Sequence, residues 1–260
     1  MIELERTKTL LSDFGLTSAQ DLLESQLERS IQKEDTYLGF LSSLLELEAS
    51  QRRRRSIETR MKLAKFPYKK TLSDFDFSFQ PGLDKRQIDE LSELSFAARA
   101  ENVIFLGPPG VGKTHLAVGL GMAAIDAGMS VYFTTLSELV RDLERAQESG
   151  KRERRWRVYL RPKILIVDEV GYMNLDQNQA ELFFRLVSQR YEHHSMIITS
   201  NKHFSDWGEM LSDPIIATAL LDRLLHHSHI VNINGNTYRL RDRVKAGINI
   251  VPRSPILQPD

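Results

Sequence analysis

The chain has 260 residues, of which 41% are hydrophobic, 27% are charged and none is cysteine, and its formal net charge at pH 7 is zero. The lack of cysteine excludes disulfides, thiolate zinc sites and cysteine nucleophiles, and the balanced charge gives no global argument for nucleic-acid binding. The length predicts one core domain with a smaller appendage, and because no long apolar run or signal-peptide pattern is present, we expect a cytoplasmic protein without a membrane span.

Residues 1–66 are predicted to form a small helical domain. Leucines recur at helical spacing among acids and amides, most clearly in the run 38–45, which indicates two or three amphipathic helices. We expect the leucine face of residues 38–47 to pack in a core, with docking of a partner as the alternative. Because Pro67 disfavours helix at the residue before it, we place the boundary there and assign residues 67–260 to a second domain.

A block of basic residues ends the predicted N-terminal domain. It spans residues 52–65 and begins with four consecutive arginines. The cations are spread around the predicted helix, so the block either grips a DNA backbone or solvates a helix that links the two domains. We therefore expect the N-terminal domain to contact DNA or a protein partner.

From about residue 100 onward, short β-rich runs alternate with helical stretches. This alternation is typical of βαβ units and predicts an α/β fold, with a parallel sheet flanked by helices on both faces. The predicted strands lie in the runs NVIFLG, VYFTT, KILIVDE, MIITSN and HIVNI.

The first predicted strand leads into a glycine-rich loop, FLGPPGVGKTHLA. It matches the pattern G-x-x-x-x-G-K-[ST] between a strand and a helix, which is the context of a phosphate-binding loop. Backbone N–H groups at the start of the helix bind phosphate, Lys113 reaches the outer phosphates, and Thr114 offers its hydroxyl to Mg²⁺. The residues predicted to bind the nucleotide are Gly107, Pro108, Pro109, Gly110, Val111, Gly112, Lys113, Thr114 and His115.

A second basic segment, KRERRWRVYLRPK, lies between the second and third predicted strands. Cations neutralise phosphates and aromatic rings stack on bases, so the segment is a candidate DNA-binding element. The alternative is a solvated basic helix with Trp156 in the protein core. The candidate DNA contacts are Lys151, Arg152, Arg154, Arg155, Trp156 and Arg157.

The third predicted strand, ILIVDE, ends in two acids. At the carboxyl edge of a parallel sheet these acids face the ligand crevice, where Asp168 would hold Mg²⁺ and Glu169 would orient and deprotonate an attacking water. A base for water favours hydrolysis over a kinase reaction, in which the acceptor supplies the nucleophile. The alternative is a solvated strand end without chemistry.

Three later features have competing interpretations. Asn201, at the end of the fourth strand, would hydrogen-bond the γ-phosphate and the attacking water, or it is an ordinary turn residue. Arg223 lies in an apolar helix, where a simple pairing with Asp213 or Asp222 is one interpretation. The histidines in the run 226–229 suggest a metal site, but no acid adjoins them in the sequence, and we expect helix-end and strand residues instead.

These pieces, in this order, resemble the AAA+ ATPases, and more closely the IstB-like family of transposition helper ATPases, which are relatives of DnaC-type helicase loaders. The resemblance covers nearly the whole chain and is carried by FLGPPGVGKTHLA, VDEVGY, RYEHHSMIITSNK, LDRLLHH and TYRLR. It implies an AAA+ P-loop ATPase core without a C-terminal lid domain, and it implies ATP and Mg²⁺ as cofactors.

The resemblance also implies roles for single residues. Glu169 is the catalytic acid, Asn201 is sensor I, and Arg223 is an arginine finger that acts on a neighbouring subunit. Arg239 is implied to be a sensor-II-like nucleotide contact. Many family members read GESYRL where this chain reads GNTYRL, so Asn236 replaces an acid close to Arg239.

The sequence therefore predicts an ATP-dependent DNA-binding regulator of transposition. Such a protein would oligomerise on duplex DNA, recruit or activate the transposase of the same mobile element, and loosen its assembly when ATP is hydrolysed. The alternative within the same fold is a DnaC-like replicative helicase loader. A nucleotide kinase is a third interpretation, which the adjacent acids of the third strand disfavour.

Overall fold

The chain divides into two compact units, Met1–Lys62 and Leu63–Asp260. The computed structural model describes residues 2–150, 152–235, 237 and 238, so that the predicted contacts Lys151 and Arg239 lie outside the described residues. The division falls a few residues before the boundary expected from Pro67. Over the described ranges, no helix combines the length and the apolar composition needed to cross a membrane.

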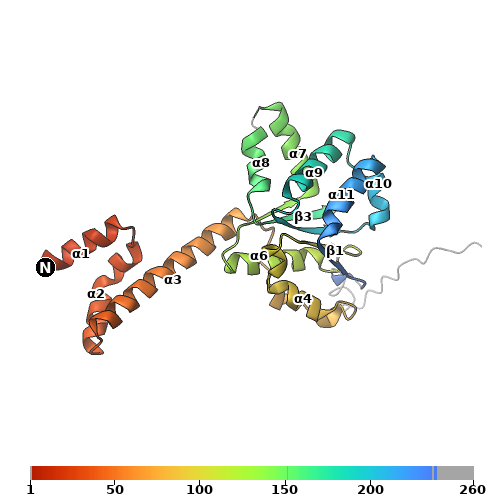
Figure 1. The fold of residues 1–260 in the computed structure, drawn as a ribbon. Helices are drawn as coiled ribbons and strands as arrows, with labels where there is room; N and C mark the ends of the chain where they lie inside the picture. The colour runs from red at the N-terminus through yellow and green to blue at the C-terminus, as the bar shows by residue number, and fades with distance from the viewer. Residues whose placement is uncertain (1, 151, 236, 239–260) are drawn as a thin grey trace, which may run out of the picture. The chain divides into compact units, whose positions relative to one another are not determined.

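Three helices form the N-terminal unit, in agreement with the predicted amphipathic pattern. They are α1 (Ile2–Asp13), α2 (Thr17–Gln32) and α3 (Tyr37–Leu63) (Figure 1). Glu48 of α3 is buried and accepts hydrogen bonds from the backbone N–H groups of Ser18 and Ala19 at 2.8 and 3.0 Å. A carboxylate at the start of α2 satisfies free helix donors and complements the helix dipole, so it ties α2 to α3.

The core of this unit is small. Ala19, Leu23 and Leu44 are buried together, whereas Leu38 and Leu45 from the same leucine run are exposed. The expectation that the leucine face of residues 38–47 packs in a core therefore holds for Leu44 and is wrong for its exposed members.

The second unit is built on a five-stranded parallel sheet, which confirms the predicted α/β class. The strand order is β2-β3-β4-β1-β5, and every neighbouring pair is parallel. All residues of β1 and β4 are buried, as expected for strands covered on both faces. The strands are β1 (Asn102–Leu106), β2 (Val131–Thr135), β3 (Ile164–Val170), β4 (Ser195–Ser200) and β5 (Ser228–Asn232).

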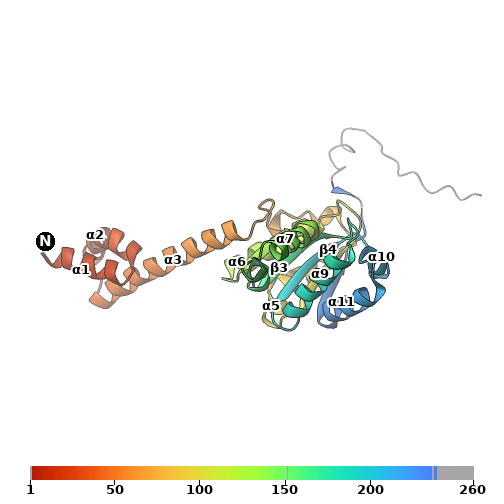
Figure 2. The same ribbon diagram turned by 90° about the horizontal axis from the view of Figure 1, so that it is seen from above.

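Helices cover both faces of the sheet (Figure 1). On one face α7 (Leu136–Glu148), α9 (Gln177–Arg190) and α11 (Pro214–His226) lie over the strands, as the view from above shows (Figure 2). On the other face lie α6 (Lys113–Asp126) and α4 (Lys85–Ser92). The shorter elements are η1 (Leu72–Asp74), η2 (Phe77–Phe79), α5 (Ser95–Ala98), α8 (Arg152–Leu160), η3 (Phe204–Asp206) and α10 (Trp207–Met210).

The strand order brings the predicted motifs together. The phosphate-binding loop follows β1 and the acidic pair ends β3, with only β4 between these two strands. The loop and the acids therefore meet at the carboxyl edge of the sheet, where ligands bind in open α/β folds.

Residues 66–75 lie against α6 and continue toward the same edge. A Cβ atom on Gly119 of α6 would lie 2.7 Å from Leu72 Cδ2, and one on Gly112 would lie 2.6 Å from Phe75 Cε2. Because glycine leaves this space free, the segment packs closely on the helix and on the loop. It forms a wall beside the phosphate-binding loop.

Candidate nucleotide-binding site

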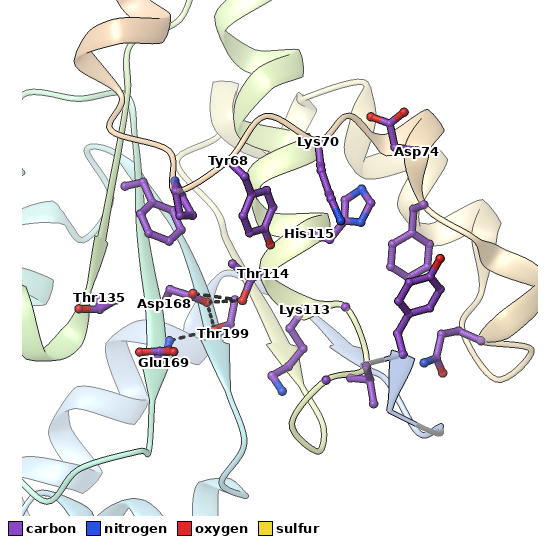
Figure 3. Close-up of a pocket in the computed structure, with 18 of the residues that line it drawn as sticks. Tyr68, Lys70, Asp74, Lys113, Thr114, His115, Thr135, Asp168, Glu169 and Thr199 are labelled. Carbon is purple, nitrogen blue, oxygen red and sulfur yellow. Dashed lines mark hydrogen bonds between the residues drawn. The ribbon is translucent and has the colours of Figure 1, made fainter. Parts of the chain in front are cut away.

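A cavity of about 380 Å³ opens at the carboxyl edge of the sheet (Figure 3). Its walls come from the phosphate-binding loop, the ends of β2, β3 and β4, residues 67–80 and Tyr238. It contains the loop residues from Gly110 to His115 together with both acids of β3. The later part of the predicted phosphate-binding loop and the predicted metal residues thus lie in one place, whereas Gly107, Pro108 and Pro109 are not among the lining residues.

The loop is shaped by glycines in the left-handed region of backbone conformation. Gly110 has φ +84° and Gly112 has φ +102°, and Gly112 is the N-cap of α6. Side chains at these positions would be strained and would also meet Thr237 and Phe75. The loop therefore delivers its backbone directly to the start of α6, whose free N–H groups favour an anion.

Lys113 is 6% exposed, and its ammonium group is held by the loop itself. Nζ donates hydrogen bonds to the carbonyl oxygens of Gly107 and Pro108 at 2.7 and 2.8 Å. A cation so placed, with little contact with water, interacts strongly with phosphate oxygens that enter the cavity.

Four polar groups from three elements form a continuous network beside the loop (Figure 3). Thr114 Oγ1 lies 3.0 and 3.1 Å from the two carboxylate oxygens of Asp168, to which it donates. Thr199 of β4 donates to the same carboxylate, and its Oγ1 accepts from the backbone N–H of Glu169 at 3.1 Å. Thr114 and Asp168 together offer a hydroxyl and a carboxylate, the hard oxygen ligands that Mg²⁺ prefers.

Glu169 has an unusual backbone conformation. Its φ is +61°, and the pairing of β3 with β4 shifts register between Val167 and Val170. A left-handed non-glycine residue costs of order 1–3 kcal/mol and persists where the surroundings hold it. Here Thr199 holds the backbone N–H of Glu169, while the side chain of Glu169 is exposed at the cavity wall.

His115 connects the loop helix to the wall formed by residues 67–80. Its Nε2 lies 2.8 Å from the carbonyl oxygen of Thr71, and its ring contacts Phe75 edge to face at 5.3 Å. Burial lowers the pKa of His115, so the neutral ring that donates to Thr71 is favoured. His115 lines the cavity, and its contacts in the structure are with Thr71 and Phe75 of this wall.

Several cavity residues were not predicted from the sequence. Thr199 lies within an otherwise mostly apolar strand. A single threonine in such a strand does not indicate which residues its hydroxyl will contact. The wall residues belong to KFPYKKTLSDFDF, a run rich in aromatic and capping residues that indicates a structured loop without identifying what it contacts. The unpredicted lining residues include Tyr68, Lys70, Asp74, Phe75, Thr135, Tyr172, Thr199 and Tyr238.

Asn201 lies directly after β4, close to the network but outside the set of cavity-lining residues. Its Oδ1 would be 2.7 Å from a Cβ atom on Gly171, in the turn that follows Glu169. Among the described residues this buried oxygen has no hydrogen-bond partner. A buried acceptor left unsatisfied is costly and marks a site where a donor can bind.

Arg223 projects from α11 and does not line the cavity of its own chain. Its Nη1 donates to the carbonyl oxygen of Ala219 at 3.0 Å, and its guanidinium lies 4.8 Å from the ring centroid of Phe184. Asp213 caps the start of α11, and among the described residues neither it nor Asp222 forms an ion pair with Arg223. The predicted alternative of a simple salt bridge is therefore wrong.

Helix α8 corrects part of the predicted DNA-contact segment. Trp156 is 5% exposed within the main core cluster, so its ring cannot stack on a base. Arg155 pairs with Asp142, which also accepts a hydrogen bond from the buried Tyr159. These inward contacts arise because α8 packs on α7 and α9.

The remaining arginines of the predicted DNA-contact segment are not part of these inward contacts. Arg154 and Arg157 are exposed on α8, and Arg152 is its first residue. Arg157 lies 3.7 Å from Glu153, an exposed i,i+4 pair of little energetic weight. The exposed arginines remain candidates for phosphate contacts.

Comparisons with known proteins identify the family to which the chain is related. The sequence model of the family described as IstB-like ATP binding protein matches residues 9–246. A Pseudomonas aeruginosa protein, named for insertion sequence IS21 and for ATP binding, is 47% identical over 98% of this chain and 96% of its own length. A Geobacillus stearothermophilus protein, named for insertion sequence IS5376 and for ATP binding, is 52% identical over 80% of this chain and 83% of its own length.

Solved structures confirm the fold. The DnaC helicase loader is 24% identical, with a TM-score of 0.51 over 57% of this chain and 86% of its own. The replication initiator DnaA, bound to AMPPCP and single-stranded DNA, is 18% identical, with a TM-score of 0.56 over 72% of this chain and 58% of its own. At these identities the likeness concerns the AAA+ fold alone.

Proposed function

This chain belongs to the family of IstB-like ATP-binding proteins, and we propose that it is an ATPase that regulates DNA transposition. In this proposal it assembles on duplex DNA with ATP bound and recruits or activates the transposase of its mobile element. The observation that carries the ATPase assignment is the network of Thr114, Asp168, Thr199 and Glu169 beside the phosphate-binding loop. Relatives named for insertion sequences support the transposition context.

The network separates two tasks of phosphoryl transfer. Thr114 and Asp168 would hold Mg²⁺, which neutralises charge on the phosphates when bound. Glu169 would accept a proton from the water that attacks the γ-phosphorus, while the bond from that phosphorus to the bridging oxygen of ADP breaks. Asn201 would orient the same water or the γ-phosphate, and Lys113 would neutralise the phosphate oxygens.

The position of Arg223 supports a site that is completed between subunits. Arg223 lies on α11, outside the cavity of its own chain. Among the described residues, its side chain contacts only the carbonyl oxygen of Ala219 and the ring of Phe184. A neighbour's arginine that reaches the γ-phosphate would make assembly depend on ATP and hydrolysis depend on assembly. The helicase-loader alternative has support from the fold alone, because the named relatives belong to insertion sequences.

Electron microscopy and sedimentation with duplex DNA test the proposal. The wild-type protein should form DNA-bound oligomers with ATP and release them as ATP is hydrolysed. Lys113→Ala should form none, because its nucleotide affinity is lost, and Glu169→Gln should form oligomers that persist. The exposed Lys85→Ala serves as a matched control, and assemblies that form equally without nucleotide would contradict the proposal.

Mixing two inactive variants tests the shared site. Arg223→Ala keeps its own base, and a neighbouring Glu169→Gln subunit supplies an intact arginine, so the mixture should recover part of the ATPase activity. A co-assembled mixture that is no more active than its components would contradict a role of Arg223 in the neighbouring site and leave only its packing against Phe184.

A further inference from the structure

Two segments at the opposite edge of the sheet bring together three side chains with metal-ligating atoms. Glu192 lies in the turn between α9 and β4, and His226 and His227 lie where α11 ends before β5. One ligand atom from each residue lies within 4.8 Å of the others, and all three side chains are exposed. No acid adjoins the histidines in the sequence, but the packing of α11 on α9 supplies one.

The two histidine rings are already placed side by side. His226 is the last residue of α11 and His227 is its C-cap, and their ring centroids are 4.1 Å apart. Tyr191 Oη lies 2.6 Å from His226 Nδ1. When Nδ1–H donates to this oxygen, Nε2 is left as the ligand atom, which is the arrangement that outer partners of metal-bound histidines normally enforce.

The backbone of Glu192 lies in the left-handed region, with φ +61°. A non-glycine residue in this conformation costs energy and persists where its surroundings hold it. The third histidine of the run, His229, pairs with Glu101 at 2.8 Å and belongs to a separate contact.

We propose that Glu192, His226 and His227 bind one divalent transition-metal ion, with water completing the coordination. Two imidazoles and a carboxylate suit Zn²⁺ and its neighbours in the first transition row. Bonds of about 2.0–2.1 Å place tetrahedral ligands roughly 3.3 Å apart, so the side chains must draw together slightly. Exposed side chains can make this adjustment by rotation without disturbing the core.

Such an ion would join the α9–β4 turn to the end of α11. Arg223 lies one helical turn before His226, so the ion would restrain the helix end next to this arginine. Hydrogen exchange in the last turn of α11 should therefore slow when the metal binds.

Titration of the untagged full-length protein with ZnCl₂ by calorimetry tests the site. The wild type should bind one equivalent with a higher melting temperature, as expected for a ligand of the native state. Co²⁺ should give the visible absorption of a site with nitrogen and oxygen ligands. The triple variant Glu192→Gln/His226→Ala/His227→Ala should lose both signals, and Tyr191→Phe should weaken binding by about tenfold.

Two controls make the outcome decisive. His203→Ala removes an exposed histidine outside the cluster and should bind Zn²⁺ like the wild type. The metal-free triple variant should melt like the metal-free wild type, because the three side chains are exposed. Equal Zn²⁺ affinity in the wild type and the triple variant, or no binding by the wild type, would overturn the proposal.

Discussion

The carboxyl edge of the sheet and helix α8 were both identified from the sequence by their charged residues, but they behave differently in the structure. At the sheet edge, Lys113, Thr114 and Asp168 meet in one cavity as predicted. On α8, the predicted DNA-contact set is split, because Trp156 and Arg155 face the protein while Arg154 and Arg157 are exposed.

The difference has a physical origin. A glycine loop and a strand end have positions that follow from local backbone geometry and from the rule that parallel strands end at one edge. A charge run on a helix has no such rule, since the neighbouring helices decide which side is buried. Periodicity can reveal a helix face only when polar and apolar residues alternate at helical spacing, and α8 is polar on most of its surface.

The largest expected effect belongs to the sheet edge. Glu169→Gln should lower the rate of ATP hydrolysis by about 10²–10⁴-fold, because an amide keeps the shape but cannot accept the proton of water. ATP affinity should remain near that of the wild type, as measured by equilibrium binding of a fluorescent ATP analogue. An equal loss of ATP affinity would contradict the separate roles assigned to Glu169 in hydrolysis and to Lys113 in ATP binding.

The next largest effect concerns the buried tryptophan of α8. Trp156→Ala should cost about 3–5 kcal/mol of stability, because the ring fills the core. Trp156→Phe should cost much less, since the indole N–H has no hydrogen-bond partner among the described residues. Chemical denaturation measures both, and a stable Trp156→Ala variant with weakened DNA binding would return the ring to the DNA-contact set.

A smaller effect concerns the buried threonine that links the two acids. Thr199→Val removes one of the two hydroxyl donors of the Asp168 carboxylate, which keeps Thr114, and leaves the Glu169 N–H without its acceptor, at a cost of about 1–3 kcal/mol. We expect a lower kcat with a smaller change in KM for ATP, and recovery in Thr199→Ser. Thermal melts control for stability, and a loss confined to melting temperature would make Thr199 merely structural.

The smallest effect concerns the exposed arginines of α8. Arg154→Ala/Arg157→Ala should weaken binding to all DNA sequences alike and lower the salt slope by about 0.9 for each lost phosphate contact. The exposed pair Lys85→Ala/Arg86→Ala is the control. If the slope falls instead for Arg53→Ala/Arg54→Ala, the basic block 52–65 is the DNA-binding element.

The sequence by itself determined the parallel α/β core, the phosphate-binding loop and the acids that follow β3. These features depend on short patterns whose geometry is local, so five strands and the loop were predicted where the structure has them. The N-terminal helices were predicted for the same reason.

Only the tertiary structure decided which side chains far apart in the chain touch one another. Thr199 contacts Asp168 because of the register in which β3 and β4 pair. Residues 66–75 can pack beside the phosphate-binding loop because glycines on α6 and in the loop leave space for them. Packing between helices also places Trp156 in the core and brings Glu192 close to His226. Such contacts are set by packing between elements, which a residue's own neighbours in sequence do not encode.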